Sequence, residues 1–239
     1  MKPHDWHIHC CAVETLTAGK ASDPAADGSG LGCIAMRVDR PPPGEGLNLG
    51  QQETVPRSAA SVIVLRDATP APEVLLVRRN PAASFMGGVW VFPGGSVSDG
   101  DGGPEGAALR ELREEAGVVL AGPEALVPFS RWITPAEVKV RFDTWFYLAA
   151  APADARPECD GEECVEVRWI APRDALDQGR RDELQLVFPT IKQLEQLAEH
   201  GSVENALSRA RGREVEPVLP RVVLGDGAAQ VLLPGEPGY

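Results

Sequence analysis

Hydrophobic residues after residue 58 follow two spacings, and the first of them is typical of strands. Residues 61–65 and 74–77 are short runs rich in Val, Leu and Ile that flank a polar segment with two prolines, residues 67–72. Runs of this length on either side of a turn segment predict a β-hairpin. The same criteria predict further strands over residues 89–92, 139–148 and 165–170.

Hydrophobic residues at helical spacing occur in two longer segments. Residues 104–119 contain one apolar stripe, with a glycine near the end of the segment, where glycine commonly stops a helix. The stripe consists of Ala108, Leu112, Ala116 and Val119. Residues 184–200 contain a second stripe, and a further helical stretch reaches about residue 210. This second stripe consists of Leu184, Val187, Ile191, Leu194 and Leu197.

This mixture of strands and helices predicts an α/β (α+β) domain over residues 58–215, followed by a tail or hairpin over residues 216–239. Residues 1–57 lack apolar periodicity and contain clusters of Gly, Pro and Asp, so we interpret them as a disordered extension. His4, His7 and His9 precede Cys10 and Cys11 there. That group either binds a soft metal or belongs to an unstructured terminus, and the lack of a second ligand pair at zinc-finger spacing favours the latter.

The charge of the chain narrows the classes of partner. The sequence has 35 Asp and Glu residues against 23 Lys and Arg, a formal net charge of −12. Binding to nucleic acid or anionic membranes relies on clustered Lys and Arg, so we expect neither partner. No run approaches the roughly 18 apolar residues of a membrane span. The chain begins without an apolar signal segment and its five cysteines are unevenly spaced, so we expect a cytoplasmic protein.

One octapeptide of the first predicted helix, Arg-Glu-Leu-Arg-Glu-Glu-Ala-Gly, concentrates charge. It places Glu111, Glu114 and Glu115 at positions i, i+3 and i+4, so the three carboxylates project into one sector beside the buried stripe. Like charges this close repel one another. A bound hard cation, which prefers oxygen ligands, relieves this repulsion. The alternative is a solvated helix face on which Arg110 and Arg113 form ion pairs.

The context of this octapeptide resembles the Nudix hydrolase family. A strand ending in Phe-Pro-Gly-Gly leads through a glycine-rich loop into the helix. The family motif is Gly, five residues, Glu, seven residues, then Arg-Glu-apolar-x-Glu-Glu-x-Gly-apolar. From Arg110 onward every fixed position matches, whereas counting from Gly95 the early Glu is replaced by Asp101, and eight residues instead of seven separate Asp101 from Arg110. A one-residue insertion in the loop explains the offset and leaves the role of Asp101 open.

The resemblance extends over about residues 58–197 and implies a Nudix-type mixed β-sheet sandwiched between helices. It also implies metal-dependent hydrolysis of a nucleoside diphosphate linked to another moiety, with Mg²⁺ or Mn²⁺ as cofactor. By motif position Glu111, Glu114 and Glu115 are metal ligands, one of them doubling as general base, and the Gly95 carbonyl is a further ligand. Arg110 orients one of the carboxylates through a charge-assisted hydrogen bond.

Family members often recruit another carboxylate from a loop outside the motif. The acidic loop before the strand at residues 165–170 is the matching place, with Glu163 as the first choice and Glu162 behind it. The alternative is that this loop is a solvated acidic segment. Cys159 and Cys164 flank the loop, and we interpret them as reduced bystanders in preference to a redox switch.

Candidate substrate-binding residues come from three arginines and one tryptophan. Arg78 and Arg79 end the second strand and Arg141 lies on a later one, so each is a candidate for an outer phosphate or a 3′-phosphate. Taken singly, each such arginine is more often an ordinary surface residue. Trp132, expected in a loop beside a Thr-Pro pair, is the candidate for stacking on a base.

The lead-in to the motif and several later segments resemble the branch that contains the peroxisomal coenzyme A diphosphatases. The segments are Val-Phe-Pro-Gly-Gly, Trp-Ile-Thr-Pro, Arg-Phe-Asp-Thr and Asp-Gly-Glu-Glu. The implied substrate is coenzyme A or acyl-coenzyme A, and ADP-ribose, NADH or another nucleotide remains an alternative. A non-catalytic Nudix-fold nucleotide sensor is the second class, and a homodimer is left open as the assembly.

Overall fold

The computed structural model describes residues 37–38, 54–83, 86–225 and 228–239. Most of the extension expected over residues 1–57, with its His and Cys cluster, lies outside the described residues. The main sheet contains β2 (Arg57–Arg66), β3 (Glu73–Arg79), β4 (Trp90–Val91), β5 (Gly94–Ser96), β6 (Val127–Ile133), β7 (Phe142–Ala150), β8 (Cys164–Ile170) and β9 (Pro217–Val218). The helices are α1 (Pro104–Ala116), α2 (Pro172–Arg180), α3 (Phe188–Leu197) and α4 (Val203–Ala210).

The main sheet is mixed. Its path runs β4-β3-β2-β7-β6-β9, with β5 paired to β2 and β8 paired to β3. The β2–β7 and β6–β9 pairs are parallel, and the other pairs are antiparallel. Parallel β2 and β7 lie in the middle of the path, buried on both faces, as the apolar run at residues 61–65 requires.

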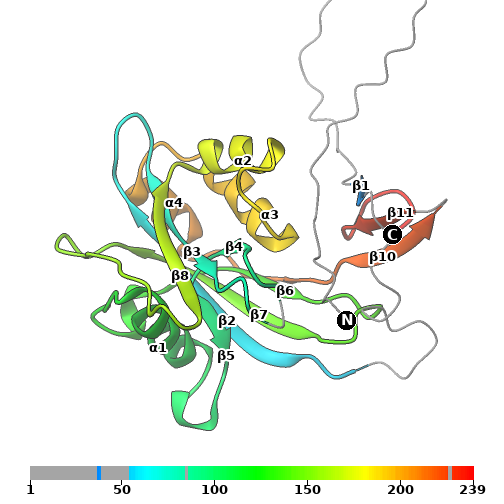
Figure 1. Cartoon of the computed structure of the whole chain (residues 1–239), viewed down its shortest axis with the longest axis horizontal. Helices are drawn as coiled ribbons and strands as arrows, with labels where there is room; N and C mark the ends of the chain where they lie inside the picture. Colours follow the sequence, from blue (N-terminus) through cyan, green and yellow to red (C-terminus); the bar gives the residue numbers. More distant parts are fainter. Residues whose placement is uncertain (1–36, 39–53, 84–85, 226–227) are drawn as a thin grey trace, which may run out of the picture.

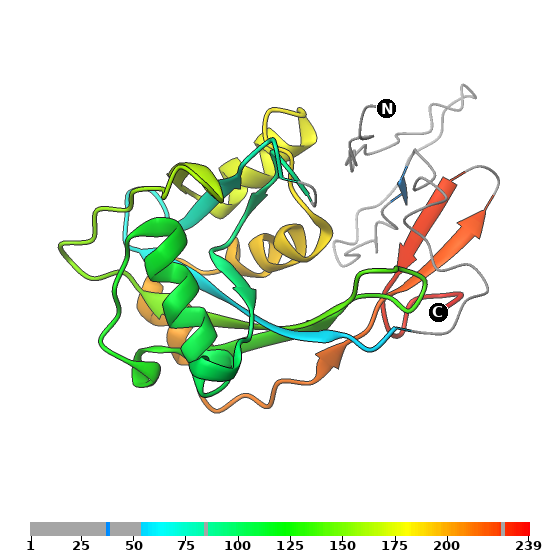
Figure 2. The same ribbon diagram turned by 60° about the horizontal axis from the view of Figure 1, so that its bottom comes forward.

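Two hydrophobic cores lie on opposite faces of this sheet because alternate residues of a strand point to opposite sides. Val62 and Val64 of β2 pack in one core with Leu112 of α1, whereas Ile63 and Leu65 pack in the other with residues of α2, α3 and α4. Figures 1 and 2 show α1 on one side of the sheet and the other three helices on the other side. The expected α/β fold, a mixed sheet between helices, is therefore confirmed.

The sheet separates where β2 and β3 part. These strands share only two residue pairs, both next to their connecting turn. Away from this turn, β2 lies between β5 and β7, whereas β3 lies between β4 and β8. The chain at residues 90–96 therefore crosses from β3 to β2, and it arrives beside α1. This crossing brings the Gly-Gly pair of the motif against the glutamate-rich helix.

The first helix ends earlier than its apolar stripe predicts. Gly117 adopts a left-handed conformation (φ 65°) and its N–H donates to the Arg113 carbonyl, so the helix closes at Ala116. Val119 is 66% exposed, and its assignment to the buried stripe was wrong. The stop at Gly117 is the reason, because it releases the chain from helical spacing before Val119.

Three further elements differ from the expectation. The predicted helix at residues 184–200 begins later, at Phe188, because Leu186 forms a bridge with Trp90 in extended conformation. Strand β6 and helix α2 have no predicted counterpart, since Pro128, Ser130 and Arg131 interrupt the apolar pattern of β6. Trp132 was expected in a loop and lies in β6 instead.

The end of the chain forms a small second sheet. Strand β10 (Arg221–Gly225) pairs antiparallel with β11 (Ala228–Leu232), which pairs with β1 (Arg37–Val38). Figure 2 shows this hairpin projecting away from the four helices. The Tyr239 hydroxyl donates to the Leu219 carbonyl (2.8 Å), which holds the last residue near the start of the hairpin. None of the helices in the described ranges is long and apolar enough to span a bilayer.

Candidate active site

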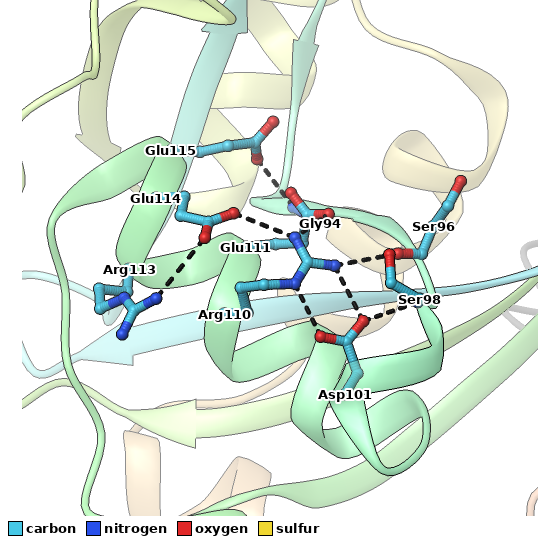
Figure 3. Close-up of polar contacts among 9 residues, drawn as sticks. All are labelled: Gly94, Ser96, Ser98, Asp101, Arg110, Glu111, Arg113, Glu114 and Glu115. Atoms are coloured by element: carbon cyan, nitrogen blue, oxygen red, sulfur yellow. Dashed lines mark hydrogen bonds and ion pairs between the residues drawn. The ribbon is translucent and has the colours of Figure 1, made fainter.

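The centre of the site is a buried carboxylate at the contact between α1 and β5. Glu115 is 2% exposed, and its Oε2 accepts a hydrogen bond from the Gly94 amide (2.9 Å; Figure 3). Gly94 must be glycine, because a Cβ there would lie 2.4 Å from the Ala60 carbonyl oxygen. The Pro-Gly-Gly segment thus provides both the close approach to β2 and the amide that meets Glu115.

Two more glutamates face Glu115. Oxygens of Glu111, Glu115 and Glu163 all lie within 4.8 Å of one another. Glu111 comes from the preceding turn of α1, and Glu163 comes from the loop that leads into β8. Three carboxylate oxygens at this spacing fit a hard divalent cation, which prefers oxygen ligands. We define these three residues as the glutamate cluster.

Burial and mutual repulsion disfavour the charged forms of the cluster. Burial, reinforced by the charge of Glu111, raises the pKa of Glu115 to about 7. Burial also raises the pKa of Glu111, with smaller contributions from Glu163 and Glu114, while Arg110 opposes the shift. A bound cation would stabilise the ionised carboxylates and reverse these shifts. The electrostatics therefore favour cation binding at the glutamate cluster.

Arg110 links the cluster to the loop before α1. Its guanidinium donates to Glu111 (2.8 Å) and Glu114 (3.0 Å) on its own helix and to the Ser96 carbonyl (3.1 Å). Both oxygens of Asp101 accept from the same guanidinium, at 2.7 Å from Nε and 3.0 Å from Nη2 (Figure 3). This bidentate pair fixes the guanidinium plane, and with it the side chain of Glu111.

Asp101, whose role the sequence left open, is the loop partner of Arg110. The contact to Arg110 and the Ser98 amide hold the pKa of Asp101 down at about 2. The Ser98 amide lies 2.7 Å from Asp101 Oδ2. Asp101 ends a short 3₁₀ turn, Asp99–Asp101, so the longer loop delivers its shorter carboxylate to the guanidinium.

The other two motif residues proposed as ligands have different surroundings. Glu114 lies outside the glutamate cluster: its side chain is 48% exposed and its oxygens face Arg110 and Arg113 (Figure 3). Gly95 lies directly against Glu111, since a Cβ at Gly95 would come within 2.3 Å of Glu111 Oε1. Gly95 is therefore next to the cluster, and the small residue makes room for the carboxylate.

Of the two arginines at the end of β3, Arg79 lies nearer to the cluster. Burial raises the pKa of both Glu115 and Cys164, and the charge of Arg79, which pairs with Cys164 in the β3–β8 ladder, partly offsets both shifts. The buried Nε of Arg79 has no hydrogen-bond partner among the described residues. Arg78 is paired differently, with Glu166 at 3.7 Å and the Gly88 carbonyl at 3.4 Å.

The structure does not support substrate contacts for Arg141 or Trp132. Arg141 is 4% exposed, and its guanidinium donates to the carbonyls of Thr134 (3.0 Å) and Thr54 (2.7 Å). Trp132 is 6% exposed and packs edge-on against Phe188 in the core. Backbone carbonyls therefore occupy the Arg141 guanidinium, which was the candidate for a phosphate. Core packing occupies the Trp132 ring, which was the candidate for a base.

Three residues near the cluster have contacts that the sequence did not predict. The buried Cys164 thiol lies against Glu115, and burial beside this carboxylate raises the pKa of the thiol. Asp160 and Asn80 hold the loop that contains Glu163. The Asp-Gly turn at residue 160 is a sequence signal for such a loop. Nothing in the sequence pairs Asn80 with it, because the two are far apart along the chain.

Comparisons with known proteins agree with this geometry. A family model described as NUDIX domain matches residues 55–189, more than half of the chain. A Caenorhabditis elegans protein provisionally named nudix hydrolase 7 is 28% identical over 223 residues, covering 77% of this chain and 74% of that protein. A Mycobacterium tuberculosis protein provisionally named 8-oxo-dGTP diphosphatase 3 is 33% identical over 128 residues, covering 51% of this chain and 55% of that protein.

Among solved structures, a NUDIX hydrolase from Alicyclobacillus acidocaldarius matches with a TM-score of 0.59 and 28% identity. The match covers 65% of this chain and 96% of that one. The chain thus spans nearly all of this neighbour, three quarters of the nematode relative and only about half of the mycobacterial one.

Replacing Asp101 tests the link through Arg110. We expect Asp101→Asn to lower the affinity of the glutamate cluster for Mn²⁺ by about tenfold, because one of the two bonds that fix Arg110 is lost. Titration calorimetry measures the affinity. Asp99→Asn makes the same change at an exposed position of the same turn and should leave the affinity intact. Equal affinities for the two variants would contradict the link.

The raised pKa of Glu115 predicts a pH-dependent stability in the presence of a chelator. The proton is bound more tightly in the folded state, so this stabilisation is complete below about pH 4.5 and is lost as pH rises through about 7. The loss is on the order of 3 kcal/mol at most. Thermal melts from pH 5 to 8 should show wild type losing stability relative to Glu115→Gln, and added Mg²⁺ should restore it. Parallel curves for the two proteins would refute the assignment.

Proposed function

The chain belongs to the Nudix hydrolase family, and on this premise we propose that it hydrolyses the diphosphate bond of a nucleoside diphosphate linked to another moiety. The observation that supports the proposal most is the glutamate cluster, three carboxylates within 4.8 Å beside the Gly-Gly segment. The named relatives include hydrolases and diphosphatases, which favours an enzyme over a nucleotide sensor.

We propose Mg²⁺ or Mn²⁺ as the cofactor, held by Glu111, Glu115 and Glu163. The donor set consists of carboxylate oxygens, which suits a hard cation. When bound, such a cation neutralises the diphosphate and lowers the pKa of water. Glu114 remains a weaker ligand candidate because its oxygens already form ion pairs with Arg110 and Arg113. The Gly95 carbonyl remains a candidate because that residue lies against Glu111.

The residues of the chain divide the remaining tasks. Glu163 is exposed and is our candidate for the carboxylate that accepts a proton from the attacking water. Arg110 is a positioning residue that holds Glu111. Arg79 is our candidate for a phosphate contact, since its buried Nε lacks a partner among the described residues and an anionic oxygen would satisfy it.

For the substrate we propose coenzyme A or its acyl esters. The support comes from the sequence segments shared with the coenzyme A branch, and from two adjacent arginines at the end of β3. Coenzyme A has a diphosphate and a separate 3′-phosphate, which call for two separate cationic contacts. Arg79 suits the diphosphate beside the glutamates. Arg78 has a 41% exposed side chain and long contacts to Glu166 (3.7 Å) and the Gly88 carbonyl (3.4 Å), and it suits the 3′-phosphate.

Glu115→Gln tests the glutamate cluster as the catalytic centre. The substitution keeps the side-chain volume and removes one ligand charge, so we expect turnover to fall by about 10²-fold or more. The fold should survive, and stability without cation at pH 8 should rise because a like-charge repulsion disappears. Glu204→Gln on α4, where the side chain is 77% exposed, is the matched control and should keep full activity. Turnover of Glu115→Gln within a few-fold of wild type would overturn the assignment.

A substrate panel tests the coenzyme A proposal. With Mg²⁺ or Mn²⁺ present, coenzyme A and water should yield 3′,5′-ADP and 4′-phosphopantetheine, measured by chromatography. Dephospho-coenzyme A should be hydrolysed more slowly, because Arg78 would then face no 3′-phosphate. The panel also includes NADH, ADP-ribose and 8-oxo-dGTP. Efficient cleavage of one of these with coenzyme A untouched would refute the substrate and leave the hydrolase proposal intact.

A further inference from the structure

Glu163 differs from the other two members of the glutamate cluster because it is exposed and lies on a loop. Glu111 and Glu115 are fixed by a helix, by burial and by their contacts to Arg110 and Gly94. An exposed glutamate on a mobile loop would lose side-chain and backbone entropy each time it entered the site. The loop therefore needs contacts that hold it in place.

One part of this support comes from within the loop. Asp160 Oδ1 accepts from the amides of Glu162 (3.2 Å) and Cys164 (2.8 Å), and Oδ2 accepts from the amide of Glu163 (3.1 Å). Gly161 permits the turn, since its φ of 79° is left-handed. A single carboxylate thus ties three consecutive amides, which fixes the backbone on both sides of Glu163.

The other part comes from a separate strand. The Asn80 side-chain amide donates to the Glu162 carbonyl (2.8 Å), and the Asn80 backbone N–H donates to the Glu163 carbonyl (2.8 Å). The side-chain oxygen of Asn80 accepts from the Ala82 amide (2.9 Å), which orients the carboxamide. Asn80 directly follows Arg79, so these bonds connect the loop to the end of β3.

We propose that Asn80 is a positioning residue that acts through the Glu162 carbonyl to hold Glu163 in the glutamate cluster. The inference rests on the proposed function of Glu163. The side-chain bond of Asn80 lies outside the β3–β8 ladder, so the ladder alone does not supply it. Because Arg79 and Asn80 are neighbours, the phosphate contact and the proton-accepting carboxylate are held by the same strand end.

Two variants of Asn80 separate its two side-chain bonds. Asn80→Ala removes both, whereas Asn80→Asp retains an acceptor for the Ala82 amide and removes the donor to Glu162. Asp160→Asn removes an acceptor from the loop itself. The matched control is Asp154→Asn, which makes the same change at an exposed position of the segment between β7 and β8. All variants are made in the full chain and assayed with coenzyme A and the panel substrate that wild type cleaves best.

Both Asn80 variants should lower kcat by about tenfold at saturating Mg²⁺ while KM stays within about twofold, because the loss concerns a displaced carboxylate and not substrate binding. Melting temperatures should change by only a few degrees. In the Glu163→Gln background the same substitutions should cause almost no further loss, since the carboxylate they position is gone. Asp160→Asn should show the same dependence on Glu163, and Asp154→Asn should match wild type.

The opposite results overturn the inference. If Asn80→Asp turns over like wild type while Glu163→Gln is impaired, Asn80 does not position the glutamate. If the losses from Asn80→Ala and Glu163→Gln multiply, Asn80 acts on something other than Glu163. If Glu163→Gln is fully active, the role proposed for Glu163 fails and the inference fails with it. Failure of the hydrolase proposal itself would appear separately, as a wild type that cleaves no substrate of the panel with Mg²⁺ or Mn²⁺ present.

Discussion

The hydrogen bond from the Gly94 amide to the buried carboxylate of Glu115 is the interaction around which the site is organised. A buried carboxylate is costly unless it is bonded, and here the partner is a backbone amide at the end of the crossing from β3 to β2. That contact is short only because Gly94 packs directly on Ala60 and Ser61 of β2. The sheet, the crossing segment and α1 therefore meet at one atom pair.

Positively charged side chains neutralise the acidic groups around this contact unevenly. Arg110 bonds to Asp101, Glu111 and Glu114, so one guanidinium serves three carboxylates on one side of α1. Glu115 receives an amide and the more distant charge of Arg79. Burial, reinforced by this excess of negative charge, raises the pKa of Glu111 and Glu115, and the same excess favours a bound cation. The same imbalance that costs stability thus favours the cation that we propose for this site.

The features that the sequence predicted well depend on local spacing. The β2–β3 hairpin, the helix with its glutamates and the mixed α/β class all follow from patterns within about 20 residues. Local spacing does not reveal the contacts of side chains whose surroundings come from distant segments. Arg141 and Trp132 were candidates for contacts to a phosphate and a base, and the partners observed for them, the Thr54 carbonyl and the Phe188 ring, are distant in sequence. The placement of Val119 in the buried stripe was wrong for a local reason, because Gly117 ends the helix before it.

The loop that contains Glu163 shows why a motif alone describes only part of such a site. The acidic segment is visible in the sequence, but an exposed acidic loop and an ordered catalytic loop have the same composition. The difference lies in Asn80, about 80 residues earlier in the chain, whose amide reaches the loop because β3 and β8 are paired. Tertiary pairing of strands thus converts a flexible acidic segment into a member of the cluster. The position of Asn80 directly after Arg79 means that any shift of this strand end moves two parts of the site at once.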